Sequence, residues 1–388
     1  MIIDRNFDSG NIKKIRIDEA ININTVYLEI LKEKYPKGTM NQYKYWFYFK
    51  ITDLEKNKPH KIVIENIDII DNAWKGFKVP FSYDNKKWTR NQSTTTDFKN
   101  RTITWDFIPK KNNIWFAYYP PYDFKRCVKI ANKFDFDILG KTKNKLPIYY
   151  LKKGTGIKHI WLLARQHPGE TIGSWMLEGF LNEIVKRKHA NILQNLTFHI
   201  ILNANPSGTI NGNWYTTQDS INLNRDWVSK KSTNTQLIST EMSKYKNYLT
   251  IDLHGDEESF KHFVAFCYGK VSPLYNRINN ALYKNIDDFR KTNFYKKDYS
   301  QKALYTTNDC VNKGLTLEGA MKHQGVRGKS LEYVPLKIGK ALANTMIDLT
   351  NARPRKHKSR RRKTHKMIVS KKRNSLRGSR KTRKQHNN

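Results

Sequence analysis

The sequence contains no long apolar run and no apolar leader at its start. No stretch of its 388 residues approaches the roughly eighteen consecutive apolar residues that a membrane span requires. The opening segment, MIIDRNFDSGNIKK, lacks the apolar centre of a secretory signal peptide. We therefore expect no membrane span and a cytoplasmic location. A chain of this length is sufficient for two domains and a tail.

Cysteine is scarce. The three cysteines, Cys127, Cys267 and Cys310, are odd in number and far apart. This usage fits a reducing compartment in which each cysteine is a small apolar side chain. The spacing argues against a metal site with cysteine ligands.

Acidic residues are few, and the last 37 residues contain none. The chain has 72 Lys and Arg against 34 Asp and Glu, a net charge of +38. Seventeen of the basic residues follow Ala352, so the first 351 residues carry 55 basic side chains and a net charge of +21. A body of this charge attracts acidic partners at long range.

The basic C-terminal segment has one short apolar triplet and cannot bury enough surface to offset its ordering entropy. We expect residues 352–388 to be disordered. Three functions fit this composition: a nucleic-acid arm, a nuclear-import signal, or a tether to an acidic surface. Composition does not choose among them or exclude a solvated tail without a partner.

Short runs rich in aromatic and β-branched residues fill the sequence before residue 145. Polar, turn-prone segments such as SYDNKKW and KKNN separate them. The runs are KYWFYFKIT (44–52), HKIVIENI (60–67), RTITWDF (101–107) and NIWFAYY (113–119). The pattern is typical of an antiparallel β-sandwich and not of a nucleotide-binding unit, so we predict a sandwich domain over residues 1–145.

After residue 145 the segments alternate between strand and helix patterns. The expected strands are HIWLLA (159–164), LTFHIILNANP (196–206), YLTIDLHG (248–255) and KGLTLEGA (313–320). Between the first two, a helical pattern places one set of apolar residues on a single face: Ile172, Trp175, Met176, Phe180 and Ile184. We predict an α/β domain over residues 146–351, with its site beyond the carboxyl ends of the strands.

The segment ARQHPGE (164–170) places His167 and Glu170 in the turn between a strand and this helix. Pro168 and Gly169 shape a loop that can direct both side chains at one point. The spacing alone is weak evidence for a metal site, because His254 and Glu257 repeat it. A hydrogen-bonded histidine at a helix start explains His167 equally simply.

Several motifs together resemble the M14 metallocarboxypeptidases, and specifically the cytosolic carboxypeptidase branch that trims glutamate from protein tails. They are HPGE (167–170), NP-x-G (205–208) followed by GN (212–213), NLNRDW (222–227), IDLHGDE (251–257) and LTLEGAM (315–321), in the family's order. Upstream, NFDSGNI (6–12), WFYFKI (46–51), KKWTRN (86–91) and AYYPPY (117–122) resemble the β-sandwich that precedes the catalytic domain in this branch. The resemblance covers about residues 6–350 and leaves out the tail.

The resemblance implies a mixed-sheet zinc carboxypeptidase domain with one Zn²⁺ per chain. Its ligands are then His167, Glu170 and His254, the two-His, one-Glu donor set of carboxypeptidase A. Zinc acidifies a bound water and polarises the scissile carbonyl. Glu318 takes the position of the catalytic acid and base. Without the resemblance, Glu318 reads as an ordinary exposed carboxylate at a strand end.

The same resemblance implies how substrate is bound. Arg225, with Asn224 beside it, takes the position that clamps the free α-carboxylate of a peptide, a task suited to a planar guanidinium. Arg165 is a further candidate for a substrate contact, although a strand-end arginine is commonly a solvated charge. Asp256, Glu257 and Glu258 either orient the ligand imidazoles or form a solvated acidic turn.

The chain departs from the family pattern at two positions. Tyr215 stands where the family's GN-x-R segment supplies an arginine that stabilises the oxyanion, and Ser207 replaces an aspartate in NP-x-G. Losing an oxyanion donor typically costs about 100- to 1000-fold in turnover, but zinc carries part of that load and a tyrosine hydroxyl can donate one hydrogen bond. Tyr215 is therefore a candidate oxyanion contact, and the departure is compatible with a slower enzyme, with a shifted substrate, or with a binding remnant that keeps its zinc.

The function expected from these features is zinc-dependent removal of C-terminal residues, above all glutamate, from acidic peptides or polyglutamylated protein tails. Two alternatives stay open. One is a zinc amidase or deacylase that acts on a non-peptide amide and does not need Arg225. The other is a catalytically weak module that binds acidic tails or nucleic acid through the sandwich and the basic tail.

Overall fold

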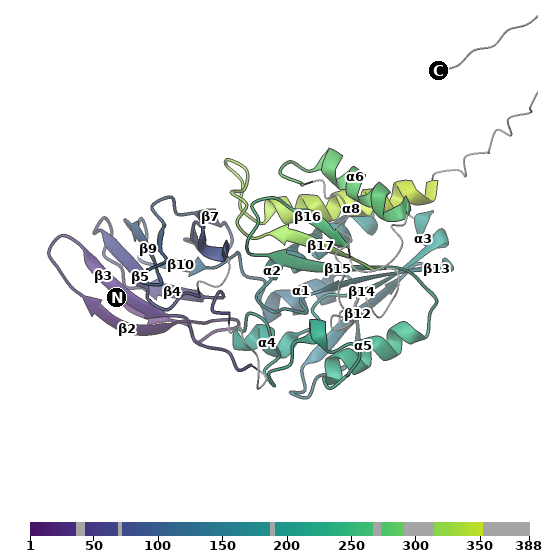
Figure 1. The fold of residues 1–388 in the computed structure, drawn as a ribbon, viewed down its shortest axis with the longest axis horizontal. Coiled ribbons are helices and arrows are strands. Elements are labelled where there is room, and N and C mark those ends of the chain that lie inside the picture. The colour runs from purple at the N-terminus through teal and green to yellow at the C-terminus, as the bar shows by residue number, and fades with distance from the viewer. Residues whose placement is uncertain (36–42, 69–71, 187–190, 267–272, 291–313, 352–388) are drawn as a thin grey trace, which may run out of the picture. The chain divides into compact units, whose positions relative to one another are not determined.

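The computed structural model describes residues 1–35, 43–68, 72–186, 191–266, 273–290 and 314–351 (Figure 1). The tail that we predict to be disordered, 352–388, lies outside these ranges, as do Cys267 and Cys310. Met1–Asn351 form one compact unit. Each helix in the described ranges is too short or too polar to span a bilayer.

The first part of the chain forms two five-stranded sheets. One sheet has the order β1 (Ile2–Asp4), β4 (Tyr48–Thr52), β10 (Ile114–Ala117), β6 (Pro80–Ser82) and β7 (Thr89–Arg90). The other has the order β2 (Lys13–Asp18), β3 (Asn24–Glu29), β5 (His60–Ile64), β9 (Thr102–Phe107) and β8 (Thr95–Asp97). Neighbouring strands run antiparallel, as predicted, except that β3 and β5 run parallel. A 3-10 turn, η1 (Asn72–Trp74), precedes β6.

Alternating side chains explain why these sheets face each other. In β3 and β5 every second residue is buried, as the pattern of a half-buried strand requires. Aromatic rings fill the space between the sheets: the Phe47 ring stacks on Trp105 at 6.2 Å between centroids, and Trp105 lies 5.3 Å from Phe116. The four aromatic-rich runs of the sequence therefore supply the core of the sandwich.

The second part of the chain forms a seven-stranded mixed sheet (Figure 1). Its order is β11 (Asp137–Lys141), β12 (Pro147–Lys153), β14 (Leu196–Ile201), β13 (Lys158–Ala164), β15 (Asn247–Asp256), β17 (Gly314–Ala320) and β16 (Phe263–Phe266). The four strands from β14 to β17 are parallel to one another, and β12, β11 and β16 pair antiparallel at the two sides. All four strands predicted for this domain are present.

Helices cover both faces of this sheet (Figure 1). The described helices are α1 (Phe124–Lys133), α2 (Thr171–Ile184), α3 (Ile192–Asn195), α4 (Pro206–Asn211), the 3-10 turn η3 (Leu223–Arg225), α5 (Thr233–Ser243), α6 (Pro273–Asn285) and α8 (Tyr333–Asn351). Strand β13 divides its buried side chains between the faces: Ile160 and Leu162 join the core formed with α2 and α8, whereas Trp161 and Leu163 join the core beneath α5.

Helix α2 is more deeply buried than a one-faced pattern predicts. The five predicted core residues are buried, but so is nearly every other residue of the helix, because α2 lies between the sheet and α8. The two helices approach closely at Gly339, where a β-carbon would stand 1.8 Å from the Met176 carbonyl oxygen. A larger residue at this position would force the helices apart.

The sandwich and the α/β domain share a continuous apolar core. The Tyr122 ring packs on the edge of Trp175 at 5.0 Å. The Pro120 carbonyl oxygen accepts hydrogen bonds from Thr171 Oγ1 at 2.9 Å and from Trp175 Nε1 at 3.1 Å. The segment that leaves the sandwich is thus bonded directly to the first turn of α2. The predicted domain limits, 1–145, 146–351 and 352–388, stay a prediction.

Candidate metal centre

The turn between β13 and α2 directs His167 and Glu170 to the same point. Arg165 starts the turn with a positive φ of 65°. Gly169 lies against Trp214, where a β-carbon would stand 2.2 Å from the indole ring, and its N–H donates to the Trp214 carbonyl at 2.9 Å. Only glycine fits this contact, which explains the Pro-Gly pair within the motif.

His254, from the end of β15, completes a three-residue cluster. The Nδ1 atoms of His167 and His254 lie 2.7 and 2.8 Å from the two carboxylate oxygens of Glu170. The Gly255 N–H donates to the same carboxylate at 2.9 Å. All three side chains are buried, and their ligand atoms lie within 4.8 Å of one another. In the described ranges, this is the one group of three or more His, Cys, Asp and Glu residues that comes so close.

This donor set fits zinc. Two imidazole nitrogens and one carboxylate converge, which is a three-ligand set that catalytic zinc sites use. Burial lowers the pKa of His167, which favours the neutral form that binds metal. Burial alone would raise the pKa of Glu170, but the two imidazoles outweigh it and hold the pKa well below its usual range. The residues present therefore match the requirements of a catalytic zinc ion.

A second layer of polar side chains orients the imidazoles. The His254 Nε2 atom lies 3.1 Å from Asp252, and the His167 Nε2 atom lies 3.2 Å from the Asn222 side-chain oxygen. Asp252 also accepts a hydrogen bond from Gln166. Burial by itself lowers the pKa of His254, but Asp252 and Glu170 reverse this effect and raise it. Such outer partners fix the ring orientation of metal-binding histidines.

Sequence reasoning missed this outer layer. Of the two roles that the sequence leaves open for Asp256, the structure shows the turn: its side chain accepts from the N–H groups of Glu258 and Ser259 after β15. Asp252 contacts the ring instead. The signal was the D-x-H spacing, because residues two apart in a strand point to the same face of the sheet.

Glu318 lies beside His254 through strand register. Strands β15 and β17 run parallel, and Glu318 is the direct partner of His254 in the ladder. Neighbouring strands are about 4.8 Å apart, so the carboxylate stands next to the cluster. Burial raises the pKa of Glu318 to about 8, with His254 opposing the rise. A carboxyl group with a pKa near neutrality can both accept and return a proton.

Asn224 and Arg225 lie in the short turn η3, which borders the cluster. The Asn224 Nδ2 atom is 3.4 Å from His254 Nε2, and its buried Oδ1 atom has no hydrogen-bond partner. Arg225 is exposed, donates to the Asn224 carbonyl at 2.7 Å, and its charge acts on the His167 ring. The structure thus brings both predicted clamp residues to the edge of the cluster.

Tyr215 also joins the cluster. Its ring stacks on His167 with 4.0 Å between centroids and 20° between planes. Its hydroxyl group bonds to the Asn222 side chain, which is also the outer partner of His167. The side chain is partly buried, so its phenol lies at the rim of the cluster.

Arg165 does not reach the cluster surface. Its side chain is 1% exposed, and its guanidinium donates to the Tyr122 carbonyl at 2.8 Å and to Thr209 Oγ1 at 3.2 Å. It is neither the solvated strand-end charge nor the open substrate contact that we considered. The positive φ at Arg165 turns the chain at this point, and the buried guanidinium bridges segments 122 and 209. We do not propose it as a substrate contact.

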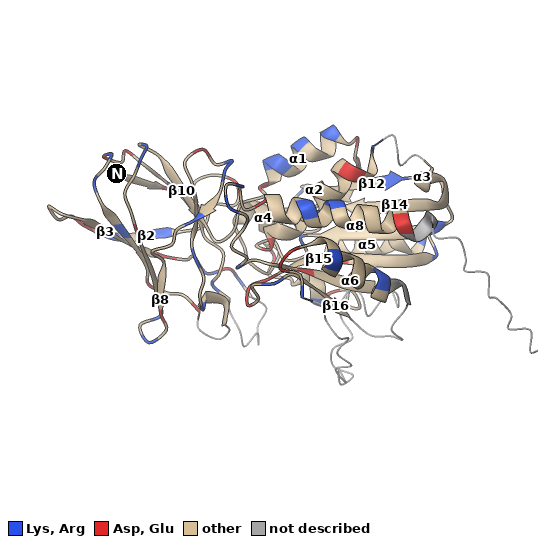
Figure 2. Ribbon diagram, turned by 90° about the horizontal axis from the view of Figure 1, so that it is seen from above, with Lys and Arg blue, Asp and Glu red and all other residues tan. Residues whose placement is uncertain are grey.

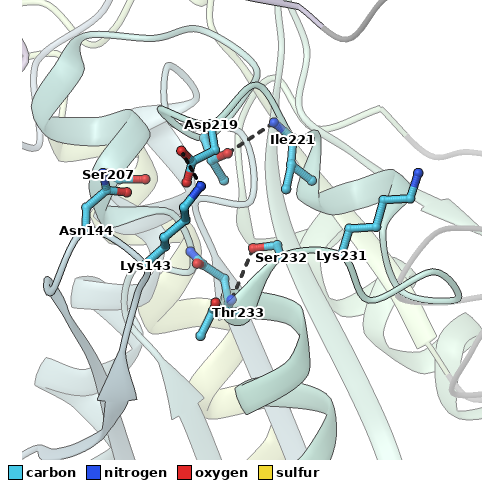
Figure 3. Close-up of a pocket in the computed structure, with 10 residues that line it drawn as sticks. Lys143, Asn144, Ser207, Asp219, Ile221, Lys231, Ser232 and Thr233 are labelled. Atoms are coloured by element: carbon cyan, nitrogen blue, oxygen red, sulfur yellow. Dashed lines mark hydrogen bonds and ion pairs between the residues drawn. The ribbon is translucent and has the colours of Figure 1, made fainter.

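Ser207, the second departure from the family pattern, lines a small polar pocket of about 90 Å³ (Figure 3). The pocket lies at the N-terminus of α5, and Lys143 pairs with Asp219 across it at 3.4 Å. The Ser207 hydroxyl accepts from the Gln218 N–H at 3.4 Å. None of the three cluster residues lines this pocket, so the two features are separate.

Two family models match the chain. The cytosolic carboxypeptidase N-terminal domain matches residues 3–119, and zinc carboxypeptidase matches residues 129–333. An uncharacterized protein of Zymomonas mobilis is 32% identical over 75% of this chain and 79% of its own length. Cytosolic carboxypeptidase 3 of Bos taurus and cytosolic carboxypeptidase 2 of Homo sapiens are each 24% identical over 69% of this chain. The matched region spans only about a third of those two proteins, 31% and 34%.

Solved structures agree on the fold. A metallo-carboxypeptidase from Pseudomonas aeruginosa, in complex with (2-guanidinoethylmercapto)succinic acid, has a TM-score of 0.80 at 23% identity and covers 90% of this chain and 99% of its own. A metallo-carboxypeptidase from Burkholderia cenocepacia has a TM-score of 0.79 at 23% identity, with 90% and 98% covered. The chain belongs to the M14 zinc carboxypeptidases and carries the N-terminal domain of the cytosolic carboxypeptidases.

Proposed function

We propose that this zinc carboxypeptidase removes C-terminal glutamate from acidic peptides or polyglutamylated protein tails. The observation that carries the catalytic assignment is the register of β15 and β17, which pairs Glu318 directly with His254. The relatives named cytosolic carboxypeptidases support the choice of branch. The net charge of +21 on the first 351 residues supports an acidic substrate.

The roles of the residues follow from their positions. His167, Glu170 and His254 hold one zinc ion, which supplies an acidified water and a polarised carbonyl when bound. Glu318, beside His254 in the sheet, accepts the proton of the attacking water and returns it to the leaving amine. Because Glu318 and His254 lie on adjacent strands of one sheet, the proton acceptor is held on the same rigid element as the ligand.

Substrate binding is assigned to the edge of the cluster. Arg225 pairs with the free α-carboxylate of the peptide, and the Asn224 Nδ2 group donates a further hydrogen bond to it. The Tyr215 hydroxyl group is an oxyanion donor that replaces the arginine of the family pattern. One neutral donor stabilises developing charge less than a guanidinium does, so we expect slow turnover.

Basic side chains are widely distributed over the molecule. Lys and Arg occur on the sandwich and on α1, α6 and α8, in addition to the 17 in the tail (Figure 2). This distribution attracts acidic protein tails without defining a single docking patch. Binding of nucleic acid or an acidic surface by residues 352–388, and nuclear targeting by them, stay predictions. A steep loss of binding with salt is expected if the tail neutralises phosphates, whereas a flat response excludes that partner.

The test is release of free amino acids from synthetic peptides that end in Glu, Asp, Lys, Phe or branched glutamate, with purified protein and zinc. We expect preferential glutamate release, and a loss of about 100-fold or more in Glu318→Gln. Glu55→Gln, which removes an exposed carboxylate of the sandwich, is the matched control and keeps full activity. Preferential release of Lys or Phe contradicts the proposed specificity but not the reaction.

A second comparison separates peptide cleavage from amide hydrolysis in general. The same peptides with an amidated C-terminus lack the carboxylate that Arg225 is proposed to bind. We expect the wild-type enzyme to prefer the free acid strongly, and Arg225→Ala to lose that preference. Equal rates on both substrates in the wild type favour the amidase alternative instead.

A further inference from the structure

The loop that carries Tyr215 is held by a carboxylate from the sandwich domain. Glu33 follows β3, and both of its oxygens lie 3.1 Å from the Tyr215 N–H. One oxygen also accepts from the Thr216 N–H at 3.3 Å and from the Thr216 hydroxyl at 3.4 Å. These contacts join residues about 180 positions apart in the chain.

Burial of the Glu33 carboxylate destabilises the fold unless hydrogen bonds satisfy both of its oxygens. Glu33 is only 8% exposed, and it forms no ion pair with a cation in the described ranges. A carboxylate removed from water without a cation destabilises a fold unless several donors compensate. Here the compensating donors are the backbone groups of one short loop and the Tyr35 side chain. The carboxylate therefore fixes the position of that loop.

The loop is held from its other side by the metal-binding turn. The Trp214 carbonyl accepts from the Gly169 N–H at 2.9 Å, and the Tyr215 ring stacks on His167. The Tyr43 ring of the sandwich lies 5.4 Å from the Tyr215 ring. Three consecutive residues, 214–216, are thus fixed between the sandwich and the candidate ligands.

We propose that Glu33 is a positioning residue of the active site, which acts from the sandwich domain by holding the Tyr215 loop against His167. The proposal rests on the proposed function for its effect on catalysis. It gives the sandwich a direct part in the reaction. The carboxylate does not touch substrate, so its effect passes through Tyr215. In the family pattern an arginine occupies this position, whereas a neutral tyrosine depends on its fixed backbone to direct a single hydroxyl.

The test is a double-mutant cycle on turnover with Glu33→Ala and Tyr215→Ala. We expect Glu33→Ala to lower kcat about tenfold and to leave KM within about twofold, because misplacement of a catalytic group costs turnover. In the Tyr215→Ala background the same change should have little further effect, because the two residues act as one unit. Glu33→Gln, which keeps one acceptor oxygen, should recover part of the loss.

Asn11→Ala is the matched control. The Asn11 side chain bonds the sandwich to the Gly212 carbonyl at 2.8 Å, three residues before Tyr215, but does not touch the loop at 214–216. It should lower stability without lowering kcat. Additive effects of Glu33→Ala and Tyr215→Ala, or an equal kcat loss in Asn11→Ala, overturn the proposal in favour of a merely structural role.

A readout that needs no activity distinguishes failure of this proposal from failure of the proposed function. We expect amide hydrogen exchange of a peptide covering residues 213–217 to increase in Glu33→Ala and to stay unchanged in Asn11→Ala. Unchanged exchange in Glu33→Ala overturns the proposal that Glu33 holds the loop, even if the enzyme is inactive on every peptide. If exchange increases but the wild type cleaves no peptide, the proposal that Glu33 holds the loop is supported and only the proposed function is refuted.

Discussion

The candidate metal centre and the sandwich use their buried charged side chains in different ways. At the candidate metal centre the buried charged side chains contact one another: Glu170 contacts His167 and His254, and His254 contacts Asp252. In the sandwich, Glu33 and Arg90 bind backbone groups of the other domain. The first arrangement creates a metal site, and the second holds the loops around it.

Arg90 is the second sandwich residue that binds backbone of the other domain, and it does so next to Glu318 rather than next to Tyr215. Its guanidinium donates to the carbonyls of His323 at 2.8 Å, Met321 at 2.6 Å and Lys78 at 2.6 Å. Residues 321–323 directly follow β17, which carries Glu318. The sandwich therefore holds the backbone next to Tyr215 through an acceptor and the backbone next to Glu318 through a donor.

Removing a ligand should have the largest effect, because it abolishes the metal site itself. We expect His254→Ala to lower bound zinc from about one ion per chain to almost none, since a catalytic site needs three protein ligands. Metal analysis after dialysis measures this directly. A variant that keeps stoichiometric zinc contradicts the ligand assignment.

Removing the hydrogen bonds from Arg90 to the backbone after β17 should affect folding more than metal binding. Arg90→Met removes donors from three carbonyls, two of them buried, and we expect a loss of about 3 kcal/mol in the free energy of unfolding. Urea denaturation of the zinc-loaded protein gives the value. Arg90→Lys keeps a charge without the planar guanidinium, and its free energy of unfolding should be intermediate. Equal stability of the wild type, Arg90→Met and Arg90→Lys contradicts a stabilising role of these hydrogen bonds.

Weakening the outer layer should reduce zinc affinity without abolishing it. Asp252→Asn removes the charge beside His254, and the expected loss of affinity is about 10- to 100-fold. Competition with a chromophoric chelator at fixed pH measures the change. Asp256→Asn is the comparison variant, because Asp256 closes a turn rather than contacting an imidazole, and it should retain near wild-type affinity.

The smallest expected effect is a pH dependence of stability at Glu33. Burial raises the pKa of Glu33 to about 7, although hydrogen bonds from Tyr35, Tyr215 and Thr216 oppose the rise. Between pH 4.5 and about 7 the folded chain keeps a proton that the unfolded chain has lost, so the free energy of unfolding falls as pH rises. Glu33→Gln should remove this part of the slope in denaturation curves recorded across that range.

Much of the fold could be predicted because the decisive patterns are local. Aromatic alternation marks the sandwich strands, and apolar runs that end in polar residues mark β13, β15 and β17. The parallel pairing of β3 with β5 escaped prediction, because strand order depends on contacts between distant segments. Motif order placed His167, Glu170, His254 and Glu318 in one region, but the distances between them required the structure.

The supporting residues could not be predicted for a related reason. Glu33 sits in a polar segment without a motif, and its partners are amide groups of residues 215 and 216, which have no sequence signature. The sequence also gives a wrong expectation for Arg165, because its place at a strand end predicts exposure while its side chain is buried. The backbone groups that a side chain can bond are set by where the folded chain passes, and not by the identity of the residues that carry those groups.

The pairing of His254 with Glu318 separates the reaction from substrate choice. These two residues are neighbours across the sheet, yet 63 residues separate them in the chain. The pairing of β15 with β17 sets the spacing between the proposed metal ligand and the proposed proton acceptor. Changes outside these strands therefore need not alter that spacing, so new specificities can evolve around the proposed catalytic pair.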